Sequence, residues 1–424
     1  MGRWQLFAGF FLMAVGGFGF WDSFQTEAAD DVWQRRRPPA SYEELREAVA
    51  RSPGNPRLWG ALGAACLLDP RHLDYRESER NLRKALALAP NDARLWGLLG
   101  DTLAISGQAE EAERVLQRAR ELAPHHFLSQ WRLANALIRV GKLDEAAPLA
   151  RGALRSNPTQ ATLMLDLGWR ISNGDQRFVE SLIPPDLPAV EYQYLRLLIN
   201  QQRVEDAVRR WKGVLAGQRD PERRLSQAFI QDLIAARAYE PAWRVWAALP
   251  ERQGLGLARA AIYDGDFRQP AAKVPIFEWR FQQNEAGARL ALDRAAASPT
   301  GGNALQITYD SPGPAFYHAR QLLVLPPGGY RLTYFVKSRD LVAASLPAVD
   351  LLGVLGKWSA RSKPPLRETQ EWQRVQHDFT VPADVGAVEL VILRPSECGT
   401  PGACAISGTV WFGGFSLEPL AKSR

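Results

Sequence analysis

Six residues in the first two thirds of the sequence are well suited to binding a ligand. Three are arginines, and the others are an aspartate, an asparagine and a tryptophan. Their spacing places them on one side of successive expected helices: Arg57, Arg94, Asp101, Trp131, Asn135 and Arg139. Guanidinium groups bind carboxylates through paired hydrogen bonds, and an indole adds an apolar contact. This set predicts a groove that binds an acidic peptide tail or an anionic glycan. A solvated face that binds nothing is the alternative.

A second set of candidates lies in the C-terminal third, in the loop GKWSARSKPP and on an expected strand nearby: Trp358, Arg361, Tyr317, His318 and Arg320. Aromatic rings pack on the C–H faces of sugars, while polar side chains bond the hydroxyls. Lys357, Arg361 and Lys363 make the loop basic, which favours an acidic polysaccharide. His318 taken alone is more typical of a structural hydrogen bond than of a ligand.

The sequence lacks the common catalytic motifs. It has no Gly-rich phosphate loop, no His-Glu-x-x-His, no Gly-x-Ser-x-Gly and no cluster of paired carboxylates. Glycosidase carboxylates can lie far apart in a sequence, so a glycan-processing enzyme stays open as an alternative. We expect a protein that is not an enzyme and that has no cofactor and no metal site.

The three cysteines bear on the compartment. Cys66 stands alone, whereas Cys398 and Cys404 close the short segment CGTPGAC. Five intervening residues that include Gly and Pro can form a small disulfide loop, which suits an oxidising space. No histidine lies close to this pair in the sequence, so the pair favours a disulfide over a zinc site.

The N-terminus carries one long apolar run. Residues 4–21 read WQLFAGFFLMAVGGFGFW, without a charge, between Arg3 and Asp22. Their length lies between the core of a signal peptide and a full transmembrane helix, and Phe20 and Trp21 resemble an interfacial aromatic belt. The run predicts an uncleaved membrane anchor, with a cleaved signal peptide as the alternative.

Helical elements with a fixed period must position the first set of residues. Pro90, Pro124 and Pro158 recur at intervals of 34 residues, and the unit between the first two carries a regular set of small and large residues: Trp96, Leu99, Gly100, Leu103, Ala112, Leu116 and Ala119. This pattern resembles the tetratricopeptide repeat family. The resemblance implies an α-solenoid over residues 41–268, after a membrane or signal segment and linker at 1–40, with a concave face that binds a protein partner.

The C-terminal third has the period of strands. Segments such as YRLTYFVKS and QRVQHDFTV are separated by turns such as LPPGG and VPADVG, which predicts an antiparallel sandwich over residues 269–424. The order of Phe277, Trp279, Tyr330, Trp372 and Trp411 along these segments resembles jelly-roll carbohydrate-binding modules of the galactose-binding-like type. That resemblance implies sugar contacts on one sheet face or its loops.

The expected fold class is therefore multidomain α + β, with a membrane segment, an α-solenoid and a jelly roll. A net charge of +6, spread along 424 residues, disfavours nucleic acid as a partner. The combination resembles bacterial accessory factors of exopolysaccharide assembly or export, which implies a scaffold in the cell envelope, facing the periplasm from the inner membrane or secreted into it. A structural protein of a membrane complex that binds no sugar is the main alternative.

Overall fold

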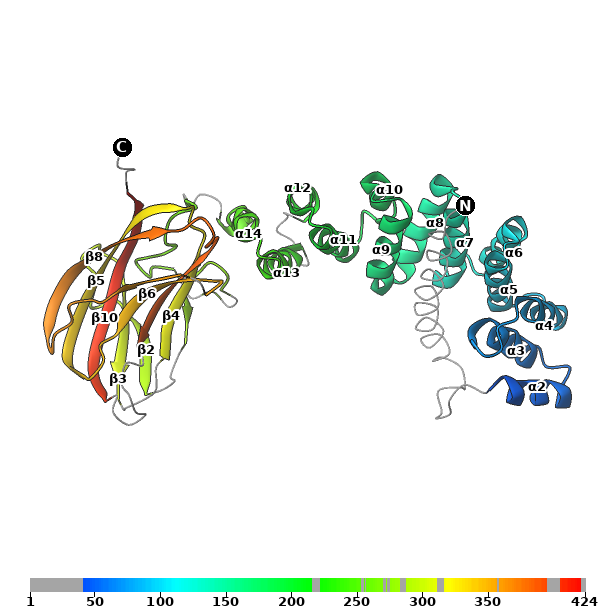
Figure 1. Cartoon of the computed structure of the whole chain (residues 1–424), viewed down its shortest axis with the longest axis horizontal. Coiled ribbons are helices and arrows are strands. Elements are labelled where there is room, and N and C mark those ends of the chain that lie inside the picture. Colours follow the sequence, from blue (N-terminus) through cyan, green and yellow to red (C-terminus); the bar gives the residue numbers. More distant parts are fainter. Residues whose placement is uncertain are drawn as a thin grey trace. The chain divides into compact units, whose positions relative to one another are not determined.

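The computed structural model describes residues 41–215, 222–252, 255, 257–269, 272, 275–282, 287–310, 316–356, 358–394 and 405–420. The chain divides into two compact units, Met1–Leu197 and Leu198–Arg424. The described part of the first unit is helical, while the second unit holds helices followed by strands (Figure 1).

Helical hairpins make up the described part of the first unit. The helices are α2 (Tyr42–Arg51), α3 (Pro56–Leu68), α4 (Tyr75–Leu88), α5 (Ala93–Ile105), α6 (Ala109–Leu122), α7 (Phe127–Arg139), α8 (Leu143–Ser156), α9 (Ala161–Ile171), α10 (Gln176–Ser181) and α11 (Pro188–Asn200), the last of which crosses into the second unit; a short 3₁₀ helix covers Pro158–Gln160. Helices α3 to α8 pair as successive hairpins (Figure 1). The α5–α6 and α7–α8 turns each use a glycine at positive φ, Gly107 at 88° and Gly141 at 80°, where other residues would be strained.

Close packing between the two helices of a hairpin explains the repeated glycines. A Cβ added at Gly63 in α3 would lie 2.7 Å from Cγ of Leu82 in α4, and one added at Gly100 in α5 would meet Leu116 of α6 in the same way. Leu82 and Leu116 are fully buried, at 0% and 1% exposure. The glycine therefore allows the leucine of the second helix to reach the first.

Replacement of Gly63 tests this packing. We expect Gly63→Ala to lower the free energy of unfolding, because the overpacking cost of about 1–3 kcal/mol exceeds the gain in helix propensity. Gly213→Ala is the matched control, since Gly213 lies in a helix with nothing within 4 Å of its added Cβ, and it should be neutral or stabilising. Chemical denaturation of both variants gives the comparison. Equal effects would contradict the packing explanation.

The second unit begins with α12 (Val204–Val214), α13 (Glu222–Ala235) and α14 (Tyr239–Ala247), followed by a 3₁₀ turn at Pro250–Arg252. Its strands are β1 (Arg280–Phe281), β2 (Ala288–Asp293), β3 (Ala304–Tyr309), β4 (Phe316–Leu323), β5 (Gly328–Ala343), β6 (Ala348–Gly353), β7 (Ser359–Ser362), β8 (Gln370–Val381), β9 (Val388–Arg394) and β10 (Ile406–Pro419). They form two five-stranded sheets, in the orders β1-β4-β9-β6-β7 and β2-β3-β10-β5-β8. All the pairs are antiparallel.

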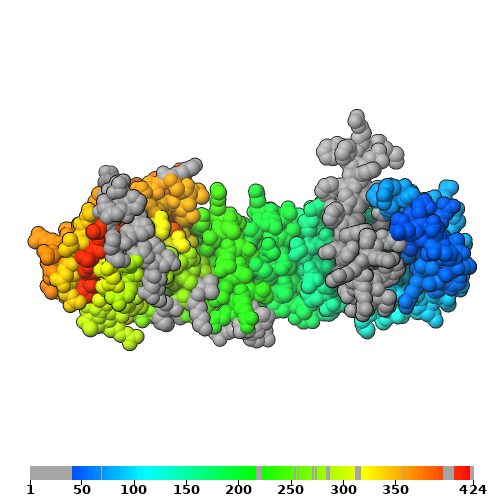
Figure 2. Space-filling model, turned by 90° about the horizontal axis from the view of Figure 1, so that it is seen from below, coloured from blue at the N-terminus to red at the C-terminus, as the bar shows by residue number. Residues whose placement is uncertain are grey.

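The two sheets enclose one apolar core. Leu332 and Val336 of β5 and Val410 of β10 pack there with Leu390 of β9 and Leu351 of β6. Strand β10 runs between β3 and β5 although about a hundred residues separate it from β3, and Figure 2 shows its red surface between the yellow-green and yellow segments. Pairing between distant segments and two stacked sheets are features of a jelly-roll sandwich.

The helical repeats and the antiparallel β-sheet domain predicted from the sequence are thus confirmed. Repeat helices end at Ala247, however, and Phe267, which was expected to lie before the sandwich, is buried in its core at 1% exposure. The expected boundary at 268/269 therefore falls within a segment that packs on the sheets. The apolar run at residues 4–21 lies outside the described residues. Within the described residues, no helix has the length and apolar character needed to cross a membrane.

Candidate functional site

The residues predicted to line the repeat groove lie on three helices of the first unit: Arg57 on α3, Arg94 and Asp101 on α5, and Trp131, Asn135 and Arg139 on α7. Residues 131, 135 and 139 follow one another at four-residue intervals, so they share one face of α7. Helix α5 packs directly on α7. The structure therefore brings five of the six candidates onto two neighbouring helices.

Asp101 joins these two helices. Its Oδ2 accepts a hydrogen bond from Nε of Arg132 on α7 at 2.8 Å, and the two side chains are only 18% and 9% exposed. A Cβ at Gly97 would lie 2.6 Å from Nη1 of Arg132, so the glycine gives the guanidinium its place against α5. Burial raises the pKa of Asp101, although the positive charges of Arg132 and Arg139 act to lower it. The carboxylate predicted as a groove ligand is thus already used between repeats.

The other candidates differ in accessibility. Arg57, Arg94 and Arg139 are exposed, while Trp131 and Asn135 are half-buried. Arg94 lies against Asp92, the N-cap of α5, with 3.4 Å between Nη2 and Oδ2. The most accessible of the six candidates are therefore the three arginines. Their binding role stays a prediction.

In the sandwich, a row of charged side chains crosses the sheet that contains β4, β9, β6 and β7. The strand register places Arg320 of β4 opposite Val391 of β9, Asp350 of β6 opposite the same Val391, and Arg361 of β7 opposite Asp350. Directly paired residues lie on one face of a sheet. The flanking residue Val349 lies in the core, so the charged row is on the outer face.

Two ion pairs organise this outer face. Arg361 bonds Asp350 through Nε, at 2.8 Å to Oδ1, and through Nη2, at 2.8 Å to Oδ2. Arg320 lies 3.7 Å from Glu389 of β9. Asp350 is nearly buried, whereas the side chains of Arg320 and Arg361 are each 37% exposed. The face thus presents arginines and carboxylates in fixed, partly accessible positions.

The remaining sugar-contact candidates fall into two groups. Tyr317 is 48% exposed and pairs with Leu393 at the edge of the same face. His318 occupies a β-bulge and is 1% exposed, with Nε2 3.0 Å from the hydroxyl of Tyr309. Trp358 packs on the core and contacts the ring of Phe379. Tyr317, Arg320 and Arg361 therefore share one surface, whereas His318 lies in the interior and Trp358 is partly buried against the core.

A small hollow of about 100 Å³ lies at the β1 edge of this sheet. Its lining includes three of the candidates and part of β1: Arg280, Phe281, Gln282, Tyr317, His318, Ala319 and Arg320. The space is much smaller than a typical small-molecule pocket of 300–1,000 Å³, so the outer face can hold a sugar unit only as an open surface.

A buried polar network connects the last helix to the sandwich within the second unit. Glu278 forms an ion pair with Arg252 and accepts a hydrogen bond from the indole of Trp246 at 3.2 Å. Arg252 also donates to the hydroxyl of Tyr263 at 2.6 Å. Gln321 of β4 bonds both the N–H and the C=O of Tyr263. The α14 helix and the sheet are therefore joined by polar as well as apolar contacts.

Family models match the helical part of the chain. One tetratricopeptide repeat model matches residues 74–137, and a second matches residues 131–169. The matched region runs from α4 to α9 and contains the hairpins described above. Residues 74–169 are tetratricopeptide repeats. Such repeats point to a scaffold for protein–protein interactions, because stacked repeats present an extended binding surface.

Solved structures resemble parts of the chain. A crystal structure of MamA is 15% identical, covers 36% of this chain and 86% of its own, and has a TM-score of 0.30. The Thermobaculum terrenum O-GlcNAc transferase, an enzyme, is 28% identical over 27% of this chain and 22% of its own, with a TM-score of 0.25. A CBM4 structure is 18% identical over 38% of this chain and 99% of its own, with a TM-score of 0.27. A search of curated proteins gives no match.

Other predicted features lie partly beyond the described residues. Cys398, Cys404 and Lys357 are outside them. In the described part of the chain, no group of three or more His, Cys, Asp or Glu side chains could hold a metal ion. The Glu278 network was not predicted from the sequence, because its members belong to separate segments with no common spacing. The equal spacing of Pro53 from Trp59 and of Pro90 from Trp96 is a sequence signal for a hydrogen bond that these two repeats share.

Proposed function

We propose that this protein is a non-enzymatic scaffold that binds a protein partner through its repeats and an acidic glycan through the outer face of its sandwich. The observation that carries the glycan part is the shared position of Tyr317, Arg320 and Arg361 on one face. An accessible aromatic ring beside guanidinium groups suits a sugar ring that carries carboxylates. The exposed arginines of α3, α5 and α7 support an acidic peptide segment as the protein partner.

Affinity electrophoresis of the full chain in gels that contain acidic or neutral polysaccharides tests the glycan part. We expect retardation by an acidic polymer, and a loss of about tenfold in affinity for Tyr317→Ala and Arg320→Ala, equivalent to about 1.4 kcal/mol. Arg331→Ala is the matched control, because Arg331 forms a cross-strand pair with Asp378 on the other sheet. A chain that binds no polysaccharide, or an equal loss for Arg331→Ala, would refute the glycan part.

A second candidate function for the sandwich is that of a structural cap without sugar binding. The Glu278–Arg252 network and the packing of Trp246 against Tyr263 and Phe277 favour it, since they bury the last helix of the repeats against the sheet. Failure of all polysaccharides to retard a folded chain would leave this candidate in place.

The location of the protein belongs to the same proposal. We propose that residues 4–21 anchor the chain in a bacterial inner membrane with the repeats in the periplasm, in support of exopolysaccharide assembly or export. The uncharged run and the spacing of Cys398 and Cys404 support this location. Mass spectrometry of protein from the native envelope should find these two cysteines linked. Two free thiols there would contradict an oxidising compartment.

A further inference from the structure

Tryptophans occupy one repeated position in the first two hairpins and donate the same hydrogen bond. The indole N–H of Trp59 on α3 lies 2.8 Å from the carbonyl oxygen of Pro53, and that of Trp96 on α5 lies 2.8 Å from the carbonyl oxygen of Pro90. In each case the acceptor precedes the donor by six residues. The indole thereby packs over the turn that leads into its own helix.

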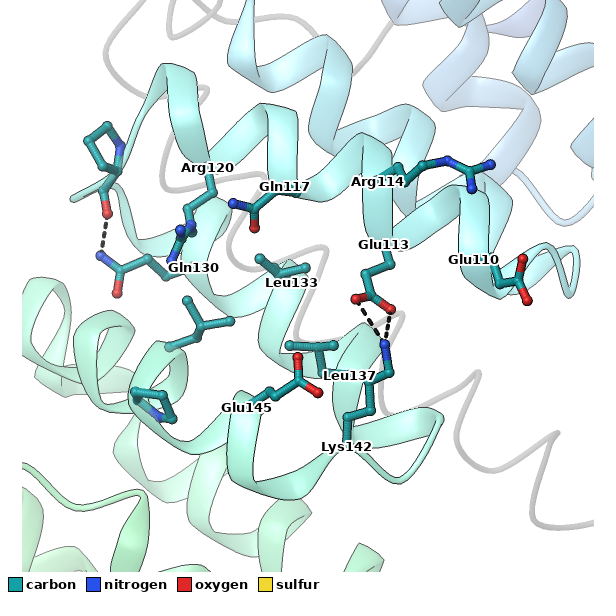
Figure 3. Close-up of a pocket in the computed structure, with 13 residues that line it drawn as sticks. Glu110, Glu113, Arg114, Gln117, Arg120, Gln130, Leu133, Leu137, Lys142 and Glu145 are labelled. Carbon is teal, nitrogen blue, oxygen red and sulfur yellow. Dashed lines mark hydrogen bonds and ion pairs between the residues drawn. The ribbon is translucent and has the colours of Figure 1, made fainter.

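The third hairpin keeps this hydrogen bond but lacks the ring. Gln130 on α7 follows Trp96 by 34 residues, and its Nε2 donates to the carbonyl oxygen of Pro124 at 2.7 Å. Beside Gln130, a groove of about 830 Å³ opens between α6, α7 and α8 (Figure 3). The groove is thus lined by the donor and the acceptor of the third hairpin, which, unlike the first two, has no indole at this position.

The groove combines an apolar base with charged ends. Leu133 and Leu137 of α7 lie along its base, with Pro148 and Leu149 of α8 beside them. None of the six residues predicted for the repeat groove is among its lining residues. It is therefore a separate surface, and an inference about it does not depend on the proposed function.

One end of this groove is acidic. Lys142 bonds both carboxylate oxygens of Glu113, at 2.7 and 3.0 Å. The hydrogen bond to Glu113 raises the pKa of Lys142, and the charges of Glu145 and Glu110 add to the effect. Three carboxylates thus lie with two cations, Lys142 and Arg114, at this end of the groove, which leaves a net negative charge.

The opposite end is basic. Figure 3 shows Arg120 with Gln117 and Gln130 at the end away from Glu113, Lys142 and Glu145. Glu110 and Arg120 are ten residues apart on α6, which corresponds to about 15 Å along the helix. An occupant should therefore carry acidic and basic groups about this far apart, with an aromatic residue near its acidic group, beside Gln130.

We propose that residues 27–37 of the same chain, EAADDVWQRRR, bind in this groove with Trp33 at the place of the missing indole. The segment lies outside the described residues, and its sequence has the required order of charges: Glu27, Asp30 and Asp31, then Val32 and Trp33, then Arg35, Arg36 and Arg37. Arg35 follows Asp31 by four positions, which is about 13 Å in an extended chain. The acidic part meets Arg120, and the arginines meet Glu110, Glu113 and Glu145.

The length of the chain permits this contact within one molecule. Trp33 precedes Ser41, the N-cap of α2, by eight residues, which reach at most about 26–29 Å. The groove lies two hairpins along the stack from α2, about 20–25 Å away at about 10 Å per packed helix layer. The bound segment would hold the predicted membrane anchor close to the repeats.

Limited trypsin digestion of the full chain in mild detergent tests this contact. The rate to be measured is that of cleavage after Arg35 and Arg36. We expect Gln130→Trp, which supplies the indole from α7 itself, to accelerate cleavage there about tenfold, since cleavage follows the fraction of open segment. Trp33→Ala should accelerate it equally, and the double variant should add nothing further. Unchanged thermal unfolding of Gln130→Trp would show that the repeats stay folded.

Charge reversal provides a matched pair of variants on α6. Arg120→Glu should accelerate cleavage, whereas Arg118→Glu should not, because Arg118 pairs with Glu121 and does not line the groove. Equal cleavage rates for the native chain and a folded Gln130→Trp variant would overturn the proposal. Protection that grows with protein concentration would place the segment of a second copy in the groove and would also overturn it.

Discussion

Glu278→Gln is expected to lower the free energy of unfolding of the second unit by about 3–5 kcal/mol, the usual cost of removing one partner of a buried ion pair. Glu278 and Arg252 are 9% and 15% exposed. One carboxylate oxygen accepts from Arg252 and Trp246, and the other accepts from the backbone N–H groups of Ile276 and Phe277 at 2.8 and 3.1 Å. In Glu278→Gln the amide nitrogen would face hydrogen-bond donors on one of these two sides. The guanidinium charge of Arg252 would then stay buried without a carboxylate partner.

Denaturant unfolding followed by tryptophan fluorescence measures this loss, because Trp246 lies within the network. Glu371→Gln is the matched control: Glu371 pairs with Lys337 at 2.7 Å but is 82% exposed, so we expect a change of at most about 1 kcal/mol. Arg252→Met combined with Glu278→Gln should recover part of the loss, since it removes the unpaired charge. A Glu278→Gln variant as stable as the control would show that the network does not hold α14 to the sandwich.

The repeats could be predicted from the sequence because each hairpin uses the same local contacts. The repeat places a glycine opposite a leucine at Gly63 and Leu82 and again at Gly100 and Leu116, although a longer turn in the first hairpin sets the two glycines 37 residues apart. Such contacts join residues close in sequence, so they leave a regular pattern. The position of Phe267 could not be found in this way, because only the folded sheets determine that it is buried.

Strands with one accessible face were predictable and strands buried on both faces were not. Strand β5 alternates buried and accessible residues over much of its length, as its sequence indicates. Strand β6, with the sequence AVDLLG, is buried at five of six positions and shows no alternation, and β7 has only four residues. Neither was expected. Central strands of this kind lack the period on which the prediction depends.

Strand β7, which was not expected, explains why Trp358 packs against the core. A polar loop suggested an exposed ring, but residues 359–362 form a strand, and alternation along it places Trp358 on the same side as Ala360, which packs on the core. Asp101 shows the same limit in the repeats, since its partner Arg132 lies 31 residues away on another helix. Residue type and spacing predicted which groups are charged, and tertiary pairing determined which of them remain accessible.

His318 should make the stability of the second unit depend on pH. Burial lowers the pKa of His318 to about 4 from its ordinary 6.5, and the nearby guanidinium of Arg394 adds to the effect. Its ring packs edge-on against Tyr309 of β3, and burial raises the pKa of that phenol, so the tyrosine supplies no negative charge. The native state therefore excludes a proton that the unfolded chain binds between pH 6.5 and 4.

The pKa of His318 is lower in the folded state than in the unfolded chain. The second unit therefore has its full free energy of unfolding, as far as this group is concerned, above pH 6.5 and loses part of it as the pH falls. The loss approaches about 3 kcal/mol near pH 4, at about 1.4 kcal/mol for each unit of pKa shift. Denaturant unfolding of the native chain and of His318→Gln across this range isolates the contribution, since carboxylates titrate alike in both. His125→Gln, at an exposed position in the first unit, should leave the pH dependence unchanged. Parallel pH profiles for the native chain and His318→Gln would mean that the imidazole takes up its proton in the folded state, and that the bulge of β4 opens to water.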